Sequence, residues 1–388
     1  MWYDFLIMDK KIHLIFAWRL TIEKWFDLVL WLCEDIINTE REDKVQLHIF
    51  GDGDLKENIP NYHFVFYHWY QLKEKVFKVW KTCDYSIMPS RFLETFGLSA
   101  LDSLSLWIPV IGHKKWGLLQ FGDGIIDLVW TSLFNTIKKL GTKPQTEYDT
   151  LSKKCKKITT EYSRDSWKQQ FETHLWIPIK WSKILFLSDY SNNMWGIETY
   201  IETVSEKLQI YGASHISRIW SIWSKKWWLR YLNLALSVYN IPLLSQIKKH
   251  IKQYNNYDLI WRHSTQRALW PMPIRWVSKN TSSKQWVMMH DFGLYHPFPS
   301  QIYSEEKIIN SKKFWKRMEA GFERLWSSIS KKILRFLPLF FKYISSWRIK
   351  NELEKNMDVF LTPSKYINPH LQEQYNKNIL IHTLPHMI

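Results

Sequence analysis

The stretch YSIMPSRFLETFGLSALD, residues 85–102, is typical of a strand, a loop and a helix in succession. The apolar run at 85–88 has the length of a buried strand, and the apolar spacing over 96–106 predicts a helix. Two acidic residues, Glu94 and Asp102, stand eight positions apart, one in the loop and one in the helix. A strand that leads through a polar loop into a helix is the repeating unit of a parallel α/β sheet.

The same alternation continues on both sides of this stretch. Around it we predict strands at 12–17, 45–50, 63–67, 85–88 and 108–111, with helices at 25–37, 72–81 and 96–106. A second series opens at Lys183, with strands at 184–187, 257–261, 286–289, 358–362 and 379–383 and a helix at 197–211. Such alternation predicts an α/β fold in which ligands lie beyond the carboxyl ends of the strands.

A polar, lysine-rich stretch at 141–182 separates the two series and contains a helical pattern at 163–173. We therefore predict a first domain over residues 1–175, a connector over 176–182, and a second domain over 183–388. A chain of 388 residues is long enough for two domains with ordinary cores.

The composition is that of a globular protein, with 46% hydrophobic and 23% charged residues. No apolar run reaches the roughly 18 residues of a membrane span, and the first ten residues lack the basic region of a signal peptide. Three widely spaced cysteines argue against a disulfide framework and fit a reducing compartment. These features predict a cytoplasmic protein.

The net charge of +16 has three interpretations. A lysine-rich proteome is favoured, attraction to an anionic membrane surface comes second, and nucleic acid comes last because no nucleic-acid-binding motif accompanies the charge. A basic helical segment at 304–355 contains the apolar run 333–341. That run is either a core-facing helix broken at Pro338 or a surface that dips into lipid headgroups.

Glycine and tryptophan occur in unusual numbers. The chain has 24 tryptophans and 12 glycines, so glycine is about 3% of residues (12 of 388), against roughly 7% in average proteins. An α/β fold of this size needs glycine at many tight turns. Something else must therefore stand at those turns.

A series of motifs in the first half resembles the nucleotide-binding C-terminal domain of retaining GT-B glycosyltransferases, family four in particular. The family pattern reads G-R-L, E-K-G, G-x-G, P-S, E-x-F-G-L-x-x-x-E-A, G-x-P-V and G-G. The matching stretches here are AWRL at 17–20, EKWFD at 23–27, GDG at 51–53, PS at 89–90, ETFGLSALD at 94–102, WIPV at 107–110 and WGL at 116–118. Their order and spacing make the resemblance specific over about residues 12–175.

The second half is similar to the N-terminal domain of the same family over about residues 183–388. ILFLS at 184–188 with MWGIE at 194–198 resembles the opening strand and its G-G-I-E loop. MHD at 289–291 resembles the His-Asp at the end of an inner strand, and DVFLTPS at 358–364 resembles the closing strand. The expected fold is thus α/β, with two Rossmann-like βαβ domains of the GT-B type.

The resemblance implies transfer of a sugar from a nucleoside-diphosphate donor to an acceptor hydroxyl, with retention. Such transfer needs cations and backbone N–H donors around two phosphates. The implied catalytic residues are Glu94, near the donor sugar, and His290, near its hydroxyls. The implied donor-binding residues are Arg19, Lys24, Gly97, Leu98, Asp102, Trp116, Gly117, Trp195 and Gly196.

Each implied role has a structural alternative. Arg19 and Lys24 read alone are surface cations, Glu94 is a helix-capping partner, and His290 is a structural histidine at a strand end. Asp102 is one methylene shorter than the glutamate that holds the ribose in the family. No cofactor and no metal ion are expected, and the acceptor, a glycan or a lipid-linked molecule, is not specified by the sequence.

Six tryptophans stand where the family pattern has glycine: Trp18, Trp25, Trp69, Trp107, Trp116 and Trp195. All lie in turns or phosphate-facing loops, where the backbone needs φ > 0 or a close approach. We hypothesise that these positions are glycines encoded by UGA and printed as tryptophan under another genetic code. A degraded or deliberately substituted protein is the alternative. Trp167, by contrast, suits a packing tryptophan.

The two halves occur in the reverse of the family's order. A circular permutation, a fusion or a fragment spanning two transferases explains this order. A permuted chain is expected to catalyse sugar transfer, in cell-envelope polysaccharide or glycolipid synthesis, in the cytoplasm or peripherally on the inner membrane face. A fragment is expected to be inactive, a relict GT-B protein acting as a membrane-associated binding module.

Overall fold

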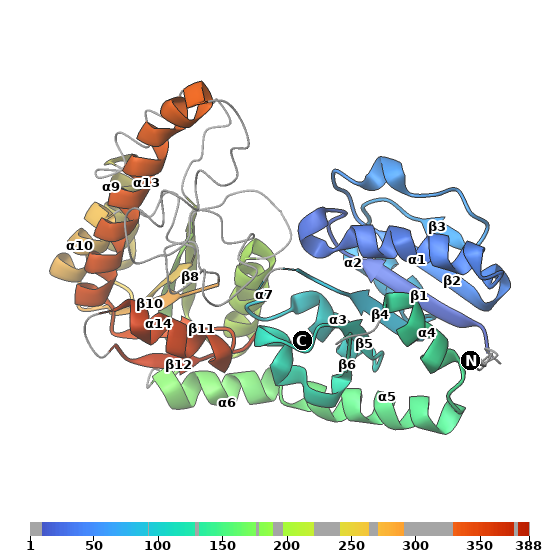
Figure 1. Cartoon of the computed structure of the whole chain (residues 1–388). Coiled ribbons are helices and arrows are strands. Elements are labelled where there is room, and N and C mark those ends of the chain that lie inside the picture. The colour runs from blue at the N-terminus through green and yellow to red at the C-terminus, as the bar shows by residue number, and fades with distance from the viewer. Residues whose placement is uncertain are drawn as a thin grey trace. The chain divides into compact units, whose positions relative to one another are not determined.

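A computed structural model of the chain describes residues 10–91, 93–128, 132–175, 178–188, 197–220, 241–263, 271–290, 329–375 and 379–387 (Figure 1). It divides into two compact units, the first over Met1–Trp167 with Met387–Ile388 and the second over Lys168–His386. The domain boundaries expected from the sequence remain a prediction, and each unit is described by itself.

The first unit is built on a six-stranded parallel sheet. Its strands are β1 Ile12–Ala17, β2 Val45–Phe50, β3 Val65–Tyr67, β4 Tyr85–Met88, β5 Val110–Gly112 and β6 Ile125–Asp127. They lie in the order β3-β2-β1-β4-β5-β6 (Figure 1). The strand order reverses between β1 and β4, where a doubly wound sheet binds its ligands.

Helices α1, α2 and α3 join strands of this sheet, as expected for parallel connections, and α4 and α5 follow β6. They are α1 Phe26–Asn38, α2 Lys73–Trp80, α3 Leu98–Ser105, α4 Leu133–Gly141 and α5 Gln145–Thr160, with 3-10 turns η1 Ile22–Lys24, η2 Glu42–Lys44, η3 Lys56–Asn58 and η4 Trp116–Gly124. Helix α1 buries Phe26, Val29, Cys33 and Ile36 on one face, at the spacing of an amphipathic helix. These side chains share one core cluster with those of β1 and β2.

The second unit has its own six-stranded parallel sheet, in the order β12-β11-β10-β9-β7-β8. The strands are β7 Lys183–Ser188, β8 His215–Trp220, β9 Leu259–His263, β10 Lys284–Met288, β11 Val359–Thr362 and β12 Ile381–Thr383. The helices are α6 Arg164–Leu175, which begins before the unit boundary, α7 Ile197–Ile210, α9 Ile241–Tyr254, α10 Pro271–Asn280, α13 Ile329–Asn356 and α14 Asn368–Gln374, with η7 Lys365–Ile367. The expected pair of Rossmann-like α/β domains is confirmed.

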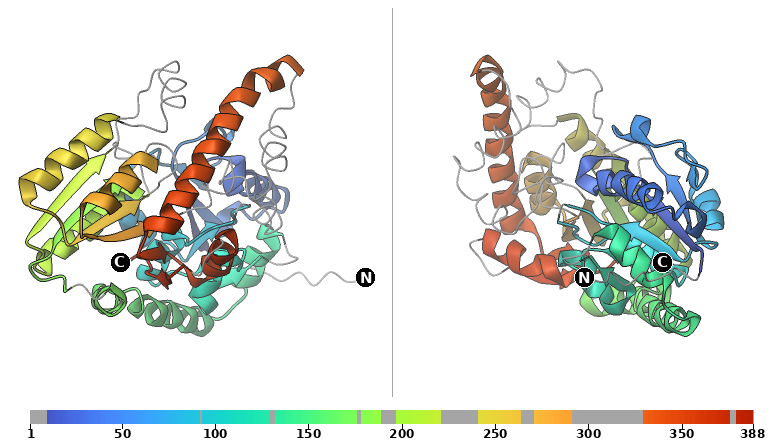
Figure 2. Two further views of the ribbon diagram at one scale, coloured as in Figure 1. Left: turned by 90° about the vertical axis from the view of Figure 1, so that its left-hand side faces the viewer. Right: turned by 45° about the vertical axis from the view of Figure 1, so that its right-hand side comes forward.

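Several elements differ from the sequence-based expectation, and three of them have a clear physical reason. Helix α13, of 28 residues and prominent in both views of Figure 2, continues through Pro338, so the predicted break is wrong. A proline removes one main-chain hydrogen bond, and the many remaining hydrogen bonds of a long helix keep the helix continuous. Strand β8 was missed because its sequence HISRIW alternates with polar residues, as suits its place at the sheet edge. Helix α5 was missed because Cys155 is its single buried residue.

Tryptophan occupies the left-handed backbone region with unusual frequency. Eight described residues other than glycine have positive φ, and five of them are tryptophan: Trp25 (φ 56°), Trp69 (59°), Trp107 (65°), Trp116 (51°) and Trp181 (70°). Four of these were expected to stand at glycine positions, and their positive φ is confirmed. Trp181 was not expected, Trp18 lacks positive φ, and Trp195 lies outside the described residues.

Trp107 shows why the backbone demands this conformation. It follows the C-cap Leu106 of α3. The Trp107 N–H donates to the Leu104 carbonyl (2.9 Å), and the Ile108 N–H donates to the Ser103 carbonyl (3.1 Å). This pair of bonds is the Schellman motif, whose left-handed residue is usually glycine. The expected packing tryptophan, Trp167, is 1% exposed and has no such conformation.

Candidate active site

The polar residues of the first unit gather where the sheet order reverses. Strand β1 is followed by a loop, the turn η1 and then α1, and β4 is followed by the loop that leads into α3. The Arg91 N–H donates to the Glu23 carbonyl (3.1 Å), which joins the two loops. Lys24 from the first loop and Glu94 from the second therefore meet beyond the carboxyl ends of β1 and β4.

Lys24 and Glu94 form a buried ion pair. The Nζ atom of Lys24 lies 2.9 Å from Oε1 of Glu94, and their side chains are 3% and 9% exposed. The hydroxyl of Ser90 donates to the same carboxylate oxygen (2.9 Å). The N-cap of α3 is Gly97, and no side chain caps it. The helix-capping alternative for Glu94 is therefore wrong, because its carboxylate serves Lys24 and Ser90.

The indole of Trp18 covers Lys24. The Nζ atom of Lys24 lies 3.4 Å from the centroid of the Trp18 ring, a cation–π contact. Burial lowers the pKa of Lys24 to about 7, against the opposing attraction of Glu94. The ammonium group is thus held between a carboxylate and an aromatic face.

Trp25 lies next to this pair, at the N-cap of α1. Its ring centroid lies 4.8 Å from that of His113 and 5.0 Å from Cζ of Arg91. Arg91 in turn binds Asp27 (Nη2 to Oδ2, 2.7 Å). Among the described residues, Nε1 of Trp25, Oδ1 of Asp27 and both ring nitrogens of His113 are buried without a hydrogen-bond partner. Several buried polar atoms of the described residues near the Trp25 indole are thus unsatisfied.

The loop at Trp116 and Gly117 touches the Glu94 segment directly. The Gly117 N–H donates to the Glu94 carbonyl (2.9 Å), and a Cβ at Gly117 would lie 2.5 Å from that oxygen. Only glycine permits this approach. Gly97, with φ +92°, opens α3 beside the same segment, and Leu98 is the first residue of the helix.

Two other expected donor-binding residues take no part in the Lys24–Glu94 ion pair. Arg19 is exposed, and no ion pair or hydrogen bond of its side chain is found within the described ranges. Asp102 binds Lys73 of α2 (Oδ1 to Nζ, 2.8 Å), so its carboxylate already has a cationic partner. The roles implied for both residues remain predictions.

The second unit holds a buried cluster at the carboxyl ends of its strands. His290 follows β10 by two residues, and its Nε2 lies 2.8 Å from Nδ1 of His263, the last residue of β9. The ring of His386 stacks on that of His290 (centroids 5.8 Å apart, 26°), and the ring of Tyr200 meets His386 edge-on (4.3 Å, 87°). The neighbouring calls on Asp291, Trp195 and Gly196 lie outside the described residues.

No functional role was predicted from the sequence for His263, His386, His113 or Ser90. A signal existed for His263, because a strand predicted to end at Trp261 runs on to His263. A polar residue at the carboxyl end of a parallel strand is a candidate site residue. His386 follows β12 by three residues and gave no comparable signal.

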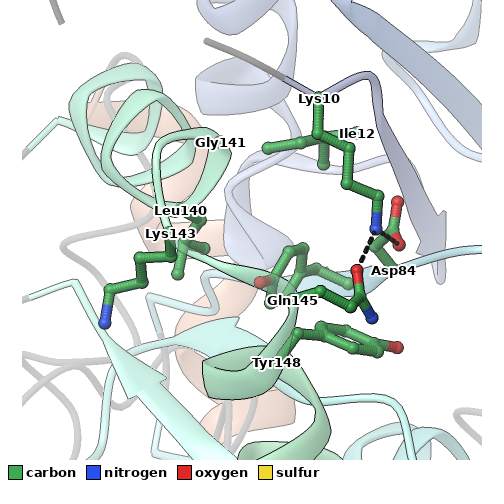
Figure 3. Close-up of a pocket in the computed structure, with 9 residues that line it drawn as sticks. Lys10, Ile12, Asp84, Leu140, Gly141, Lys143, Gln145 and Tyr148 are labelled. Carbon is green, nitrogen blue, oxygen red and sulfur yellow. Dashed lines mark hydrogen bonds and ion pairs between the residues drawn. The ribbon is translucent and has the colours of Figure 1, made fainter.

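A small cavity lies at the opposite edge of the first sheet, before β1 and β4. It has a volume of about 20 Å³, room for about one water molecule, and is lined by residues such as Tyr148 (Figure 3). Figure 3 shows the Lys10 amine directed at Asp84 (3.1 Å) and Gln145 (3.0 Å). It is too small for a nucleotide sugar. The described part of the chain holds no group of three His, Cys, Asp or Glu side chains arranged for a metal ion.

Comparisons with known proteins point to one family. Residues 4–121 match the family model described as glycosyl transferases group 1. A search of curated proteins finds no match.

Solved structures with partial likeness include Anabaena HepE in complex with UDP-glucose (13% identity over 39% of this chain and 44% of that one, TM-score 0.32). The catalytic domain of cholesterol-α-glucosyltransferase from Helicobacter pylori matches at 14% identity over 39% of this chain and 99% of that one (TM-score 0.33). TarM of S. aureus matches at 21% identity, over 40% of this chain and 34% of that one (TM-score 0.34). This chain therefore spans less than half the length of HepE and TarM.

The family match includes the loops that carry Lys24, Glu94 and Gly117. Residues 4–121 of this chain are therefore similar to the glycosyl transferases group 1 family.

Proposed function

We propose that the chain transfers a sugar from a nucleoside-diphosphate donor to an acceptor hydroxyl, with retention at the anomeric carbon. The observation that carries the proposal is the buried Lys24–Glu94 pair at the switch point of the first sheet, inside the matched family segment. Charge that builds on a leaving diphosphate is stabilised by cations and N–H donors already in place.

The first unit offers these groups in one loop cluster. Lys24 supplies a point charge, and Arg19, exposed beside it, supplies a planar fork for bidentate phosphate contact. The N–H groups at Gly97 and Leu98 open α3, whose N-terminus favours an anion. Glu94 holds Lys24 in position, so diphosphate binding must share that ammonium group with the carboxylate.

Asp102 is proposed for the ribose hydroxyls and His290 for the hydroxyls of the transferred sugar. Burial raises the pKa of Asp102, and the ion pair with Lys73 at 2.8 Å opposes that rise by favouring the charged carboxylate. We further propose a glycan or lipid-linked acceptor, with a role in cell-envelope polysaccharide or glycolipid synthesis. No metal ion and no cofactor is required, because the cations of the chain itself meet the phosphates.

One observation favours a second candidate, a relict protein that binds without catalysing. In the printed sequence the Trp18 indole lies 3.4 Å from Nζ of Lys24, in the space that a phosphate would need. Trp25 and Trp116 add bulk at neighbouring glycine positions. A chain with these indoles is expected to bind a nucleotide sugar poorly.

The deciding experiment compares two forms of the full chain. One is the printed sequence, and the other carries glycine at residues 18, 25, 69, 107, 116 and 195. Release of nucleoside diphosphate from a panel of nucleotide sugars is measured for both, with Trp31→Gly as a control at a helical tryptophan. Turnover confined to the six-glycine form supports the enzyme and the glycine hypothesis together. Absence of turnover in every form would overturn the catalytic proposal.

A peripheral position on an anionic membrane is also proposed, from the net charge of +16. In the described parts of the chain, no helix combines the length and hydropathy that a membrane crossing needs. Co-sedimentation with vesicles containing anionic lipid tests this, with binding expected at low salt and lost at high salt. Equal recovery with neutral and anionic vesicles would remove the membrane from the proposal.

A further inference from the structure

The histidine pair at the end of the second sheet is a hydrogen bond between two uncharged imidazoles. Nδ1 of His263 lies 2.8 Å from Nε2 of His290, and the two side chains belong to residues that are 0% and 9% exposed. Burial lowers the pKa of His290 to about 3 and that of His263 well below its ordinary value. Both rings are therefore neutral at pH 7, and a single proton lies between the two nitrogens.

Two arrangements of that proton are possible, and each one fixes both tautomers. In the first, His263 donates from Nδ1, so its Nε2 is a bare acceptor and His290 carries its proton on Nδ1. In the second, His290 donates from Nε2, so His263 must carry its own proton on Nε2. The choice between them depends on what surrounds Nε2 of His263.

Nε2 of His263 is buried without a hydrogen-bond partner among the described residues. The second arrangement would place an N–H there with no acceptor, and orphaned buried N–H groups are rarer than under-satisfied acceptors. Phe186 and Trp261 pack against the ring of His263 (centroids 5.6 and 5.0 Å), and neither side chain carries an oxygen acceptor. The first arrangement is therefore favoured.

We infer that His263 is a positioning residue that fixes His290 as the Nδ1–H tautomer, so that His290 acts as a hydrogen-bond donor and not as a general base. The inference rests on the proposed function in one respect, that the group receiving this hydrogen bond is a hydroxyl oxygen of the transferred sugar. A neutral donor at this place orients the sugar and takes no proton from the acceptor.

The packing around the pair keeps the donor ring in place. The His290 ring stacks on His263 (5.2 Å, 28°) and on His386 (5.8 Å, 26°), and Tyr200 meets it edge-on (5.4 Å, 74°). Rotation of the imidazole about its own axis is thus opposed by rings on several sides. The hydrogen bond from His263 then selects which nitrogen of the fixed ring bears the proton.

The test reads the tautomer directly, by long-range ¹H–¹⁵N correlation spectra of the histidine rings in the full chain at pH 7. The wild-type chain is expected to show His290 protonated on Nδ1 and bare on Nε2. His263→Phe keeps the ring volume and removes the donor, and a mixture of His290 tautomers is expected. His263→Asn places an amide N–H where Nδ1 stood, and the Nδ1–H tautomer of His290 should return. A wild-type His290 protonated on Nε2, or a His290 tautomer unchanged in His263→Phe, would overturn the inference.

A second test measures turnover, in whichever form of the chain is active. Loss of one neutral hydrogen bond is worth about 1 kcal/mol, so His263→Phe should lower kcat/KM about fivefold to tenfold, with recovery in His263→Asn. The two failures are distinguishable. A chain that shows the Nδ1–H tautomer and no turnover retains the assignment of His263 and loses the proposed reaction.

Discussion

The left-handed conformation of Trp107 predicts a reversal in the effect of glycine at two otherwise similar sites. Trp107 has φ 65° and is 47% exposed, at the C′ position of α3. Trp31 is 54% exposed and lies in the middle of α1. Replacing each tryptophan by alanine and by glycine removes the same contacts within a site. The difference between the two variants therefore isolates the backbone.

The magnitude follows from the two backbone costs. At residue 107, alanine retains the strain of the left-handed conformation, about 1–2 kcal/mol. Glycine removes this strain but loses about 0.5–1 kcal/mol of stability, because its unfolded chain has more conformational entropy. Trp107→Gly should therefore be more stable than Trp107→Ala by about 0.5–1 kcal/mol. At Trp31 the order reverses, because glycine inside a helix is about 1 kcal/mol worse than alanine. The two differences are separated by about 1.5–2 kcal/mol.

Urea unfolding followed by thiol labelling measures this in the full chain. All three cysteines are buried, and all lie in the first unit, so their labelling reports the unfolding of that unit alone. Burial raises the pKa of the Cys33 and Cys155 thiols to about 12, which keeps them unreactive until the unit opens. If alanine is better than glycine at both sites, the left-handed assignment of Trp107 is refuted.

Three further predictions concern the titrating groups. Lys24 has a pKa of about 7 when folded and 10.5 when unfolded, so between these values the unfolded chain binds more protons than the folded chain. The free energy of unfolding of the first unit should therefore rise with pH, by up to about 1.4 kcal/mol per pH unit between pH 7 and 9. Urea midpoints measure the slope, which Lys24→Met should flatten. Trp18→Gly should uncover the ammonium group and raise the Lys24 pKa toward its ordinary value, as read by NMR of ¹⁵N-labelled lysine; an unchanged pKa would show that the indole does not cause the burial. His263, His290 and His386 are uncharged in the folded chain, whereas unfolded imidazoles take up protons below about pH 6.5. The second unit should therefore lose stability as pH falls below that value. Amide hydrogen exchange at pH 7 and 5 measures this loss, and equal protection at both values would contradict the prediction.

The sequence predicts the central strands well because their patterns are continuous and apolar. Strands β1, β2 and β4 have the bounds expected from their runs of buried residues. Two of the four edge strands were not predicted, since β6 has three residues and β8 alternates with polar side chains. A short or half-exposed strand carries too little periodic signal to be told from a loop.

For the candidate site, the sequence predicted individual residues from local motifs but did not predict the contacts that they make across the fold. Lys24 and Glu94 were each predicted from their motifs, but their ion pair was not, because 70 residues separate them in the chain and the strand order brings them together. The partnership of Asp102 with Lys73 has the same origin. His263 was missed by a strand boundary set two residues early. Composition predicted the anomaly at glycine positions, and the backbone angle located it at individual residues.

The tryptophans with positive φ have a practical consequence for making the protein. If their codons are UGA, an ordinary bacterial host reads the first of them as a stop signal and releases a peptide that contains no complete domain. A synthetic gene must then choose a residue at every such codon before any chain is made. The backbone angle supplies that choice position by position, with glycine at Trp25, Trp69, Trp107, Trp116 and Trp181 and tryptophan at Trp167.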